Sequence, residues 1–334
     1  MKKLLQQLTE TFGPSGYEEN VRKLIEAEVK PLADEVKVDA LGSLIVRKKP
    51  AKGSKNSRKI MIAAHMDEIG LMVSHIDEKG FVHFMPIGGV FRKYVVGGRV
   101  RFLNGTHGVL GYDNLSNVNE LPTLDKVYID VGATSKKDCP VQVGDVAAFD
   151  RPYIEMGDRL VAKSMDDRVG VLVAIEALRA LASTPHDVYF VFTTQEEVGT
   201  RGAGTSAYGV DPDLGIAVDV TPTADTPNGL KMEMALGKGP CIKIQDAGAI
   251  SDPRIVKWMI NTAEKNKIPY QREVLLLGGT DARAIQAVRA GVPAGGISIP
   301  VRYVHSPSEM VDLSDVQNSI KLLTALLRTP IDLG

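Results

Sequence analysis

Short apolar runs with polar residues at or soon after their carboxyl ends restrict the possible folds of this chain more than any other pattern in it. These runs are KIMIAAH (59–65), DVYFVFTT (187–194), LGIAVDV (214–220) and PAGGISIP (293–300). A run of this length and apolarity is typical of a strand that is covered on both faces, as in a parallel sheet. A strongly apolar helix is expected over 166–182, between the first two runs. We therefore predict an α/β domain in which helices cover both faces of one sheet.

The middle of the chain follows a different pattern. From about residue 69 to 157, short alternating strands and turns replace helical periodicity, as in LMVSHIDEKGFVHFMPI and KVYIDVG. This pattern predicts a small all-β domain, barrel-like or PDZ-like, inserted at 69–157. The α/β domain is then discontinuous and comprises residues 1–68 and 158–334.

Local signals place the remaining elements of the α/β domain. The segment EVKVDALGSLIVRKK (35–49) is expected to form a hairpin that turns at Gly42. Helices are expected from capping residues and apolar periodicity over 1–11, 18–30, 251–266, 280–291 and 314–329.

Composition excludes several functional classes. Lys and Arg total 40 against 41 for Asp and Glu, so charge gives no basis for binding nucleic acid or a membrane surface. The two cysteines, Cys139 and Cys241, form no CxxC motif, so neither a structural zinc site nor a disulfide framework is expected. No segment approaches the roughly 20 apolar residues of a membrane span. Gln6 and Gln7 interrupt the apolar N-terminal run before it reaches the length of a signal core, so we expect a cytoplasmic protein.

Polar residues cluster in the sequence at the ends of the apolar elements. They are His65, Asp67, Asp166, Asp167, Glu196, Glu197, Asp219 and His305. Ligands of open α/β sheets bind beyond the carboxyl ends of the strands, so these side chains are expected at one edge. Imidazoles with carboxylates suit zinc, cobalt or manganese better than copper or an iron–sulfur cluster. The carboxylates outnumber the ligands of one tetrahedral ion, which favours two ions that share a bridging carboxylate.

Two adjacent glutamates, Glu196 and Glu197, follow one of these strands. Neighbouring strand residues point in opposite directions, so one can bind a metal while the other acts as general base on the water between the metals. The residues alone leave the assignment open. Each candidate also has a structural interpretation, since the Asp166–Asp167 pair could simply begin a helix. The co-occurrence of all of them beside apolar elements favours the metal site.

Four other histidines have no such context, and we expect them to be non-catalytic: His75, His83, His107 and His186.

Five motifs in order, AAHMDEIG, KSMDDRVG, TTQEEVGTRGA, AVDV and RYVHSPSE, resemble those of the dinuclear metalloaminopeptidases of the tetrahedral-assembly (TET) type. That family includes glutamyl aminopeptidases and cellulase M-like proteins. The resemblance covers nearly the whole chain, from FGPSGYE (12–18) through GGTDA (278–282) to HSPSEM. It implies a phosphorylase/hydrolase-like α/β/α sandwich. It also implies that the inserted β domain forms dimers and that dimers assemble into a tetrahedral dodecamer, with a stable dimer as the other option.

The resemblance implies two metal ions per subunit, with zinc or cobalt favoured and manganese as a further option. His65 and Asp219 would bind one ion. Glu197 and His305 would bind the second ion. Asp166 would bridge both.

The resemblance also implies roles for the residues beside these ligands. Asp67 would orient the ring of His65, and Glu196 would be the general base. The peptide bond between Asp166 and Asp167 would be cis.

We therefore expect an aminopeptidase that hydrolyses short peptides with a free N-terminus. Residues 274–282 are expected to form part of the pocket for the N-terminal side chain. The leucines at 275–277 are also consistent with a core strand. An apolar pocket would favour Leu, Ile or Met, whereas an inward-facing Arg272 would favour Glu or Asp, and we expect a leucyl-type preference.

Other functions fit the sequence less well. Related two-metal N-deacylases and carboxypeptidases usually carry their extra domain later, whereas here it precedes Asp166. A glucanase is disfavoured because aromatic residues are only 5% and Trp258 is the single tryptophan. A non-catalytic assembly protein is disfavoured because clustered carboxylates repel one another without a metal.

Overall fold

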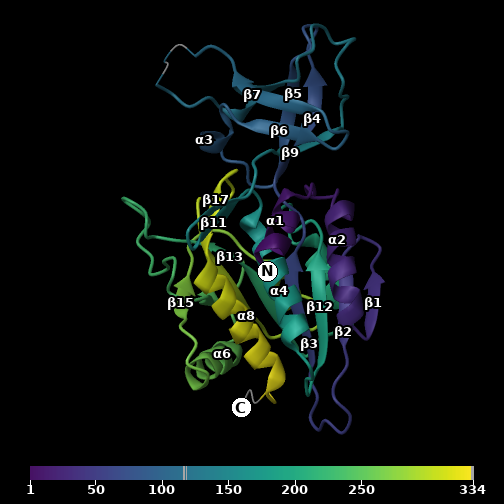
Figure 1. Ribbon diagram of the computed structural model, residues 1–334, viewed down its shortest axis with the longest axis vertical. Coiled ribbons are helices and arrows are strands. Elements are labelled where there is room, and N and C mark those ends of the chain that lie inside the picture. The colour runs from purple at the N-terminus through teal and green to yellow at the C-terminus, as the bar shows by residue number, and fades with distance from the viewer. Residues whose placement is uncertain (116, 118, 332–334) are drawn as a thin grey trace.

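The computed structural model describes residues 1–115, 117 and 119–331, which form an α/β domain and a β-barrel (Figure 1). Within these residues, the α/β domain contains an 11-stranded sheet. Its central strands run parallel in the order β12 (Asp187–Thr193), β3 (Lys59–His65), β13 (Leu214–Pro222) and β16 (Ala294–Arg302). Their apolar composition follows from burial on both faces, as expected from the sequence.

Further strands extend the sheet at its edges. On one side, β2 (Leu44–Lys48) pairs with β12, and β1 (Glu35–Val38) pairs with β2 through a turn that contains Gly42 at φ +103°. On the other side, β16 pairs with β17 (Glu309–Asp312), which is followed by β11 (Arg159–Ala162) and β10 (Ile154–Met156). A branch from β16 is formed by β14 (Cys241–Gln245) and β15 (Gln271–Val274).

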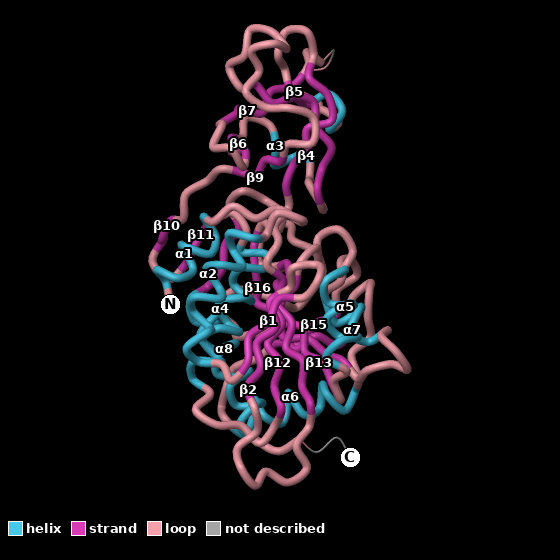
Figure 2. Tube along the Cα trace, turned by 90° about the vertical axis from the view of Figure 1, so that its right-hand side faces the viewer, coloured by secondary structure: helices cyan, strands magenta, loops and turns pink. Residues whose placement is uncertain are grey.

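Helices cover both faces of the sheet (Figure 2). One face carries α2 (Glu19–Val29), α4 (Met165–Ala180), α6 (Pro253–Lys265) and α8 (Leu313–Arg328). The short 3₁₀ turn Lys30–Leu32 extends α2, and α1 (Lys2–Glu10) packs on α4. The other face carries α5 (Arg201–Val210) and α7 (Asp281–Gln286). The strand period of two divides the core, because Ile60 and Ile62 face one layer and Met61 and Ala63 face the other. The predicted sandwich is confirmed.

Several helix ends differ from the sequence prediction by one or more residues, and two of them have a clear physical reason. α7 ends at Gln286 rather than near 291, because left-handed turns at Arg289 (φ +51°) and Gly291 (φ +98°) return the chain to β16. α8 begins at Leu313, one residue before the predicted start, and is capped by Asp312, whose carboxylate accepts the Ser314 N–H at 2.8 Å.

The inserted segment forms a closed barrel with the strand order β4-β5-β8-β7-β6-β9. Its strands are β4 (Gly70–Ile76), β5 (Val82–Ile87), β6 (Arg99–Phe102), β7 (His107–Tyr112), β8 (Val127–Asp130) and β9 (Val146–Phe149), with the short helix α3 (Arg92–Val95) and the 3₁₀ turn Leu124–Lys126. β10 lies within the predicted insertion but pairs with β11 of the large sheet, because the chain reverses tightly at Gly157 (φ +65°). We therefore propose that the insertion ends near residue 150.

In the described ranges, every helix is too short or too polar to cross a lipid bilayer.

A buried arginine fixes the N-terminal segment to the α/β domain. The Arg168 side chain, near the start of α4, is fully buried. It donates hydrogen bonds to the carbonyls of Leu8, Thr11 (3.0 Å) and Met66 (2.6 Å). Its guanidinium also lies 3.5 Å from the carboxylate of Glu68. Arg168 therefore connects α1 and the following loop to the end of β3.

We predict that Arg168→Met lowers the unfolding free energy of the α/β domain by about 3–5 kcal/mol, because buried carbonyls lose their hydrogen-bond donor and Glu68 loses one of its two cationic partners. Urea denaturation followed by Trp258 fluorescence measures this, since Trp258 lies in α6 and is 7% exposed. Arg179→Met, on the exposed end of α4, is the matched control and should cost at most about 1 kcal/mol. Equal losses in the two variants would contradict the assigned role of Arg168.

Candidate metal centre

The central strands end at the edge of the sheet that faces the barrel (Figure 1), and several of the polar residues singled out in the sequence lie at or after these strand ends. β3 ends at His65, and β12 ends two residues before Gln195, which adopts φ +56° and leads into Glu196 and Glu197. His305 lies in the turn after β16, also in the left-handed region at φ +60°. The carboxyl ends of parallel strands therefore bring distant segments together.

One carboxylate lies between the two histidines. Asp166 Oδ1 is 3.0 Å from His65 Nε2, and Asp166 Oδ2 is 3.2 Å from His305 Nε2. Glu197 Oε2 is 3.3 Å from the same His305 nitrogen. Asp219 Oδ1 is 3.9 Å from His65 Nε2, on the other side of the cluster. This arrangement brings together the five residues for which metal binding was expected.

Asp167 also joins the cluster, although no ligand role was assigned to it from the sequence. Candidate ligand atoms of His65, Asp167 and Asp219 lie within 4.8 Å of one another. The oxygens of Asp167 accept main-chain N–H bonds from His65 and Gly170, both at 3.1 Å. Asp167 therefore also fixes the end of β3 against the start of α4. The peptide bond between Asp166 and Asp167 is cis, as the resemblance implied.

The electrostatics of the cluster favour the binding of a cation. Burial raises the pKa values of Asp167, Asp219 and Glu197, and the negative charge of neighbouring carboxylates raises them further. Carboxylates crowded in this way are stabilised as anions by a bound cation. Imidazole nitrogens and carboxylate oxygens are donors that suit divalent zinc, cobalt or manganese. The donor set therefore fits divalent metal ions.

Asp67 contacts both His65 and the glutamate pair. Its main-chain carbonyl is 3.1 Å from His65 Nδ1, and its carboxylate is farther away, at 3.4 Å. The carboxylate instead accepts the N–H groups of Glu196 (3.0 Å) and Glu197 (3.1 Å) and the hydroxyl of Ser15 (2.6 Å). Asp67 therefore holds the ring of His65 mainly through its backbone and holds the glutamate pair through its side chain.

Glu309 is a buried residue of the site that the sequence reasoning missed. Its Oε1 accepts the N–H of His305 at 2.6 Å, and its Oε2 accepts the N–H of Asp166 at 3.0 Å. Burial, with the negative charge of Asp166, raises the pKa of Glu309 to about 8. The only signal in the sequence was its place in the motif HSPSEM, four residues after His305.

The barrel domain orients one of the histidines. The carbonyl of Gly89 lies 2.8 Å from His305 Nδ1, which leaves Nε2 directed at Asp166 and Glu197. The ring of Phe91 lies 5.7 Å from the imidazole, centroid to centroid. A partner on the distal nitrogen of a metal-binding histidine fixes both its tautomer and its direction. Nothing in the local sequence around Gly89 signalled this contact.

The remaining histidines lie away from this cluster. His75 and His83 lie against each other in the barrel, and His107 is exposed on β7. His186 Nε2 contacts the carbonyl of Thr329 at 2.9 Å.

We predict that Gly89→Ala weakens metal binding about 10- to 100-fold, because the added Cβ would lie 2.6 Å from His305 Nδ1 and displace the ring. Metal titration of the chelator-treated protein measures this affinity without an assay of activity. Gly209→Ala in α5 is the matched control, since its Cβ would meet no heavy atom within 4 Å. Unchanged affinity in Gly89→Ala would refute the coupling of the barrel to His305.

Comparison with known proteins gives a consistent result. A family model described as M42 glutamyl aminopeptidase matches residues 42–322. The lysyl aminopeptidase of Pyrococcus furiosus is 37% identical over 340 residues, which cover 97% of this chain and 96% of that protein.

Solved structures agree with the sequence matches. Aminopeptidase APDkam598 from the archaeon Desulfurococcus kamchatkensis has a TM-score of 0.94 at 43% identity and covers 98% of this chain and 94% of its own. The TET1 peptidase of Pyrococcus horikoshii, which can assemble into a tetrahedron or a large octahedral shell, has a TM-score of 0.89 at 33% identity, with 98% and 99% covered.

Proposed function

The chain belongs to the M42 glutamyl aminopeptidase family, and from this premise we propose that it is a metal-dependent aminopeptidase of short peptides with a free N-terminus. The observation that carries the proposal is the placement of the Asp166 carboxylate between His65 and His305. A carboxylate that lies between two imidazoles can bind two metal ions at once. A salt bridge with a purely structural role would need only one of the two histidines.

Two divalent cations, Zn²⁺ or Co²⁺ with Mn²⁺ as a further option, would supply an activated water and neutralise charge at the attacked carbonyl oxygen. His65 and Asp219 would hold one ion, and Glu197 and His305 would hold the other. Asp166 would contact both. The separations of these side chains across the cluster, 3.0–3.9 Å, support this division.

Glu196 is the general base in this proposal. Its Oε2 lies 4.0 Å from His65 Nε2, so its side chain faces the cluster, while its main chain is held by Asp67. Burial raises the pKa of Glu196 well above its ordinary value, although the charge of His65 opposes this effect. A raised pKa makes the carboxylate a better proton acceptor. Glu196 would take a proton from the attacking water and give it to the leaving amine.

We predict that Glu196→Gln lowers kcat about 10²- to 10⁴-fold, because the amide cannot accept the proton. Metal content should be unchanged, since the metal ligands remain. Steady-state kinetics and elemental analysis of the same preparations measure both quantities. Glu78→Gln, at an exposed position of the barrel, is the charge-matched control and should behave as the parent protein. Near-normal turnover of Glu196→Gln would rule out its role as base.

The reaction class is tested by digestion of short peptides followed by mass spectrometry. We expect stepwise loss of N-terminal residues and resistance of N-acetylated peptides, because the free amine is part of the recognised group. Chelation should abolish the digestion, and Zn²⁺ or Co²⁺ should restore it. Removal of C-terminal residues, or release of acetate, would instead identify a related carboxypeptidase or deacylase.

The preference for the N-terminal residue is proposed to be leucyl-type. Leu276 and Leu277 are 82% and 71% exposed, so the alternative of a core strand does not hold for them. The segment that carries them leads into α7. At the start of α7, Asp281 accepts a hydrogen bond from Thr193, the last residue of β12, at 2.5 Å. These leucines are therefore available to an apolar side chain. A marked preference for glutamyl peptides in the same digestion would overturn this choice.

The inserted barrel is proposed to pair two chains, with dimers assembling into a tetrahedral dodecamer. Exposed apolar side chains on the barrel support an interface there: Met85, Leu103, Val109 and Val143 are 52–65% exposed. The similarity to the TET1 peptidase supports the tetrahedral arrangement. Light scattering distinguishes a dodecamer from the alternative of a stable dimer.

A further inference from the structure

The loop between α1 and α2 lies against the site, although its motif FGPSGYE (12–18) has no role in the proposed reaction. Pro14 forms a parallel bridge with Glu68, and the Ser15 N–H donates to the Glu68 carbonyl at 3.3 Å. The Gly13 N–H donates to the Glu68 side chain at 3.0 Å. The loop is therefore fixed to the segment that follows β3.

The turn that presents the glutamate pair is held by two carboxylates from outside the turn. Asp67 accepts the N–H groups of Glu196 and Glu197, as described above. Glu18 accepts the N–H of Gln195 at 3.1 Å. Three consecutive main-chain N–H groups, from 195 to 197, therefore donate to acidic side chains. Charged acceptors form stronger hydrogen bonds than neutral acceptors, so this turn is firmly constrained.

Glu18 is placed unusually for a residue at the start of a helix. It occupies the N-cap position of α2, where an acidic side chain normally accepts N–H bonds from its own helix. Here the side chain makes no such bond. Its Oε1 instead accepts the N–H of Gly16 at 2.8 Å and that of Gln195, and the residue is only 4% exposed. Burying a carboxylate costs free energy, so this position serves something other than helix capping.

We propose that Glu18 is a positioning residue for catalysis, which holds Gln195 in its left-handed conformation and thereby directs the side chain of Glu196 at the cluster. The inference rests on the proposed role of Glu196 as base. A non-glycine residue at φ +56° is unfavourable unless its surroundings hold it there. Without the acceptor on Glu18, the turn relaxes, and a displacement of about 1 Å at Glu196 lowers the rate up to about 10²-fold.

Two substitutions at the same position separate positioning from charge. Glu18→Ala removes the acceptor, and we expect kcat to fall about 10- to 100-fold with KM and metal content within about twofold of the parent values. Glu18→Gln keeps an oxygen that can accept both N–H groups, so it should restore kcat to within about threefold. A Glu18→Ala protein with normal kcat, or a Glu18→Gln protein as impaired as Glu18→Ala, would overturn the proposal.

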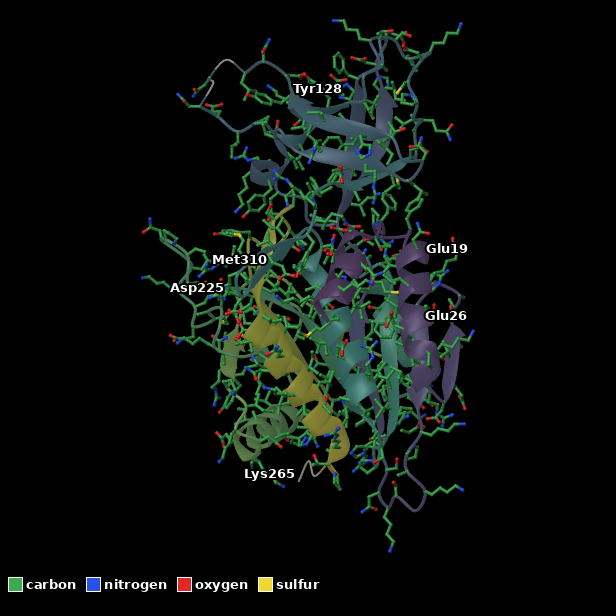
Figure 3. All side chains as sticks on the ribbon, in the orientation of Figure 1. Glu19, Glu26, Tyr128, Asp225, Lys265 and Met310 are labelled. Carbon is green, nitrogen blue, oxygen red and sulfur yellow. The ribbon has the colours of Figure 1, made fainter. Side chains whose placement is uncertain are left out.

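Glu19→Ala is the matched control for packing and helix charge. Glu19 is the next residue of α2 and lies on its outer side (Figure 3). Its carboxylate forms an ion pair with Lys23 at 2.7 Å, in which both side chains are more than 60% exposed. An exposed pair of this kind contributes little to stability. If kcat fell as much in Glu19→Ala as in Glu18→Ala, the loss would come from a general change in α2 and not from the hydrogen bond between Glu18 and Gln195.

Hydrogen exchange of the metal-loaded full-length protein gives a readout that does not depend on activity. The amides of residues 195–197 should exchange at least about tenfold faster in Glu18→Ala than in Glu18→Gln or Glu19→Ala. Unchanged exchange would refute the role of Glu18. If exchange changed as expected while Glu196→Gln remained active, the assignment of the base would be wrong but the turn would still be held by Glu18.

Discussion

Buried negative charge at the carboxyl edge of the sheet is the constraint on which this site depends. The same edge holds two kinds of carboxylate. Burial favours the neutral form of Glu68, but Lys163 and Arg168 more than offset it, so the pKa of Glu68 is lowered. Burial and neighbouring anions raise the pKa of Asp167 and Asp219 instead. The first carboxylate already has cationic partners, whereas the other two are suited to a metal ion.

Hydrogen bonds that involve main-chain groups fix the direction of the candidate metal ligands. The strands alone bring these ligands only to the same edge. Glu309 holds the backbone at His305 and Asp166 together, and Asp167 ties the end of β3 to the start of α4. Asp67 connects the ring of His65 with the turn that contains the glutamate pair. Fixing donors in this way before a cation or substrate binds reduces the reorganisation that the reaction requires.

Two segments outside the central sheet complete the site. The N-terminal loop reaches the glutamate turn and is anchored by Arg168, and the barrel reaches His305 through the carbonyl of Gly89. Because both contacts involve main-chain groups, they depend on how the α/β domain, the loop and the barrel pack together. The inserted domain therefore contributes directly to the geometry of the site, in addition to any role in assembly.

The sandwich, the inserted β domain and the residues that converge at the edge could be predicted from the sequence, because apolar runs covered on both faces and polar residues at their ends leave local patterns. His65, Asp166 and His305 could be identified in this way. The pairing of β10 with the large sheet, and the contacts of Gly89 and Glu309 with His305 and of Glu18 with Gln195, emerge only from the folded structure. Those contacts join groups far apart in the chain, often through main-chain atoms that every residue possesses. A local sequence pattern carries no record of such partners, since their positions are fixed by the packing of the whole molecule.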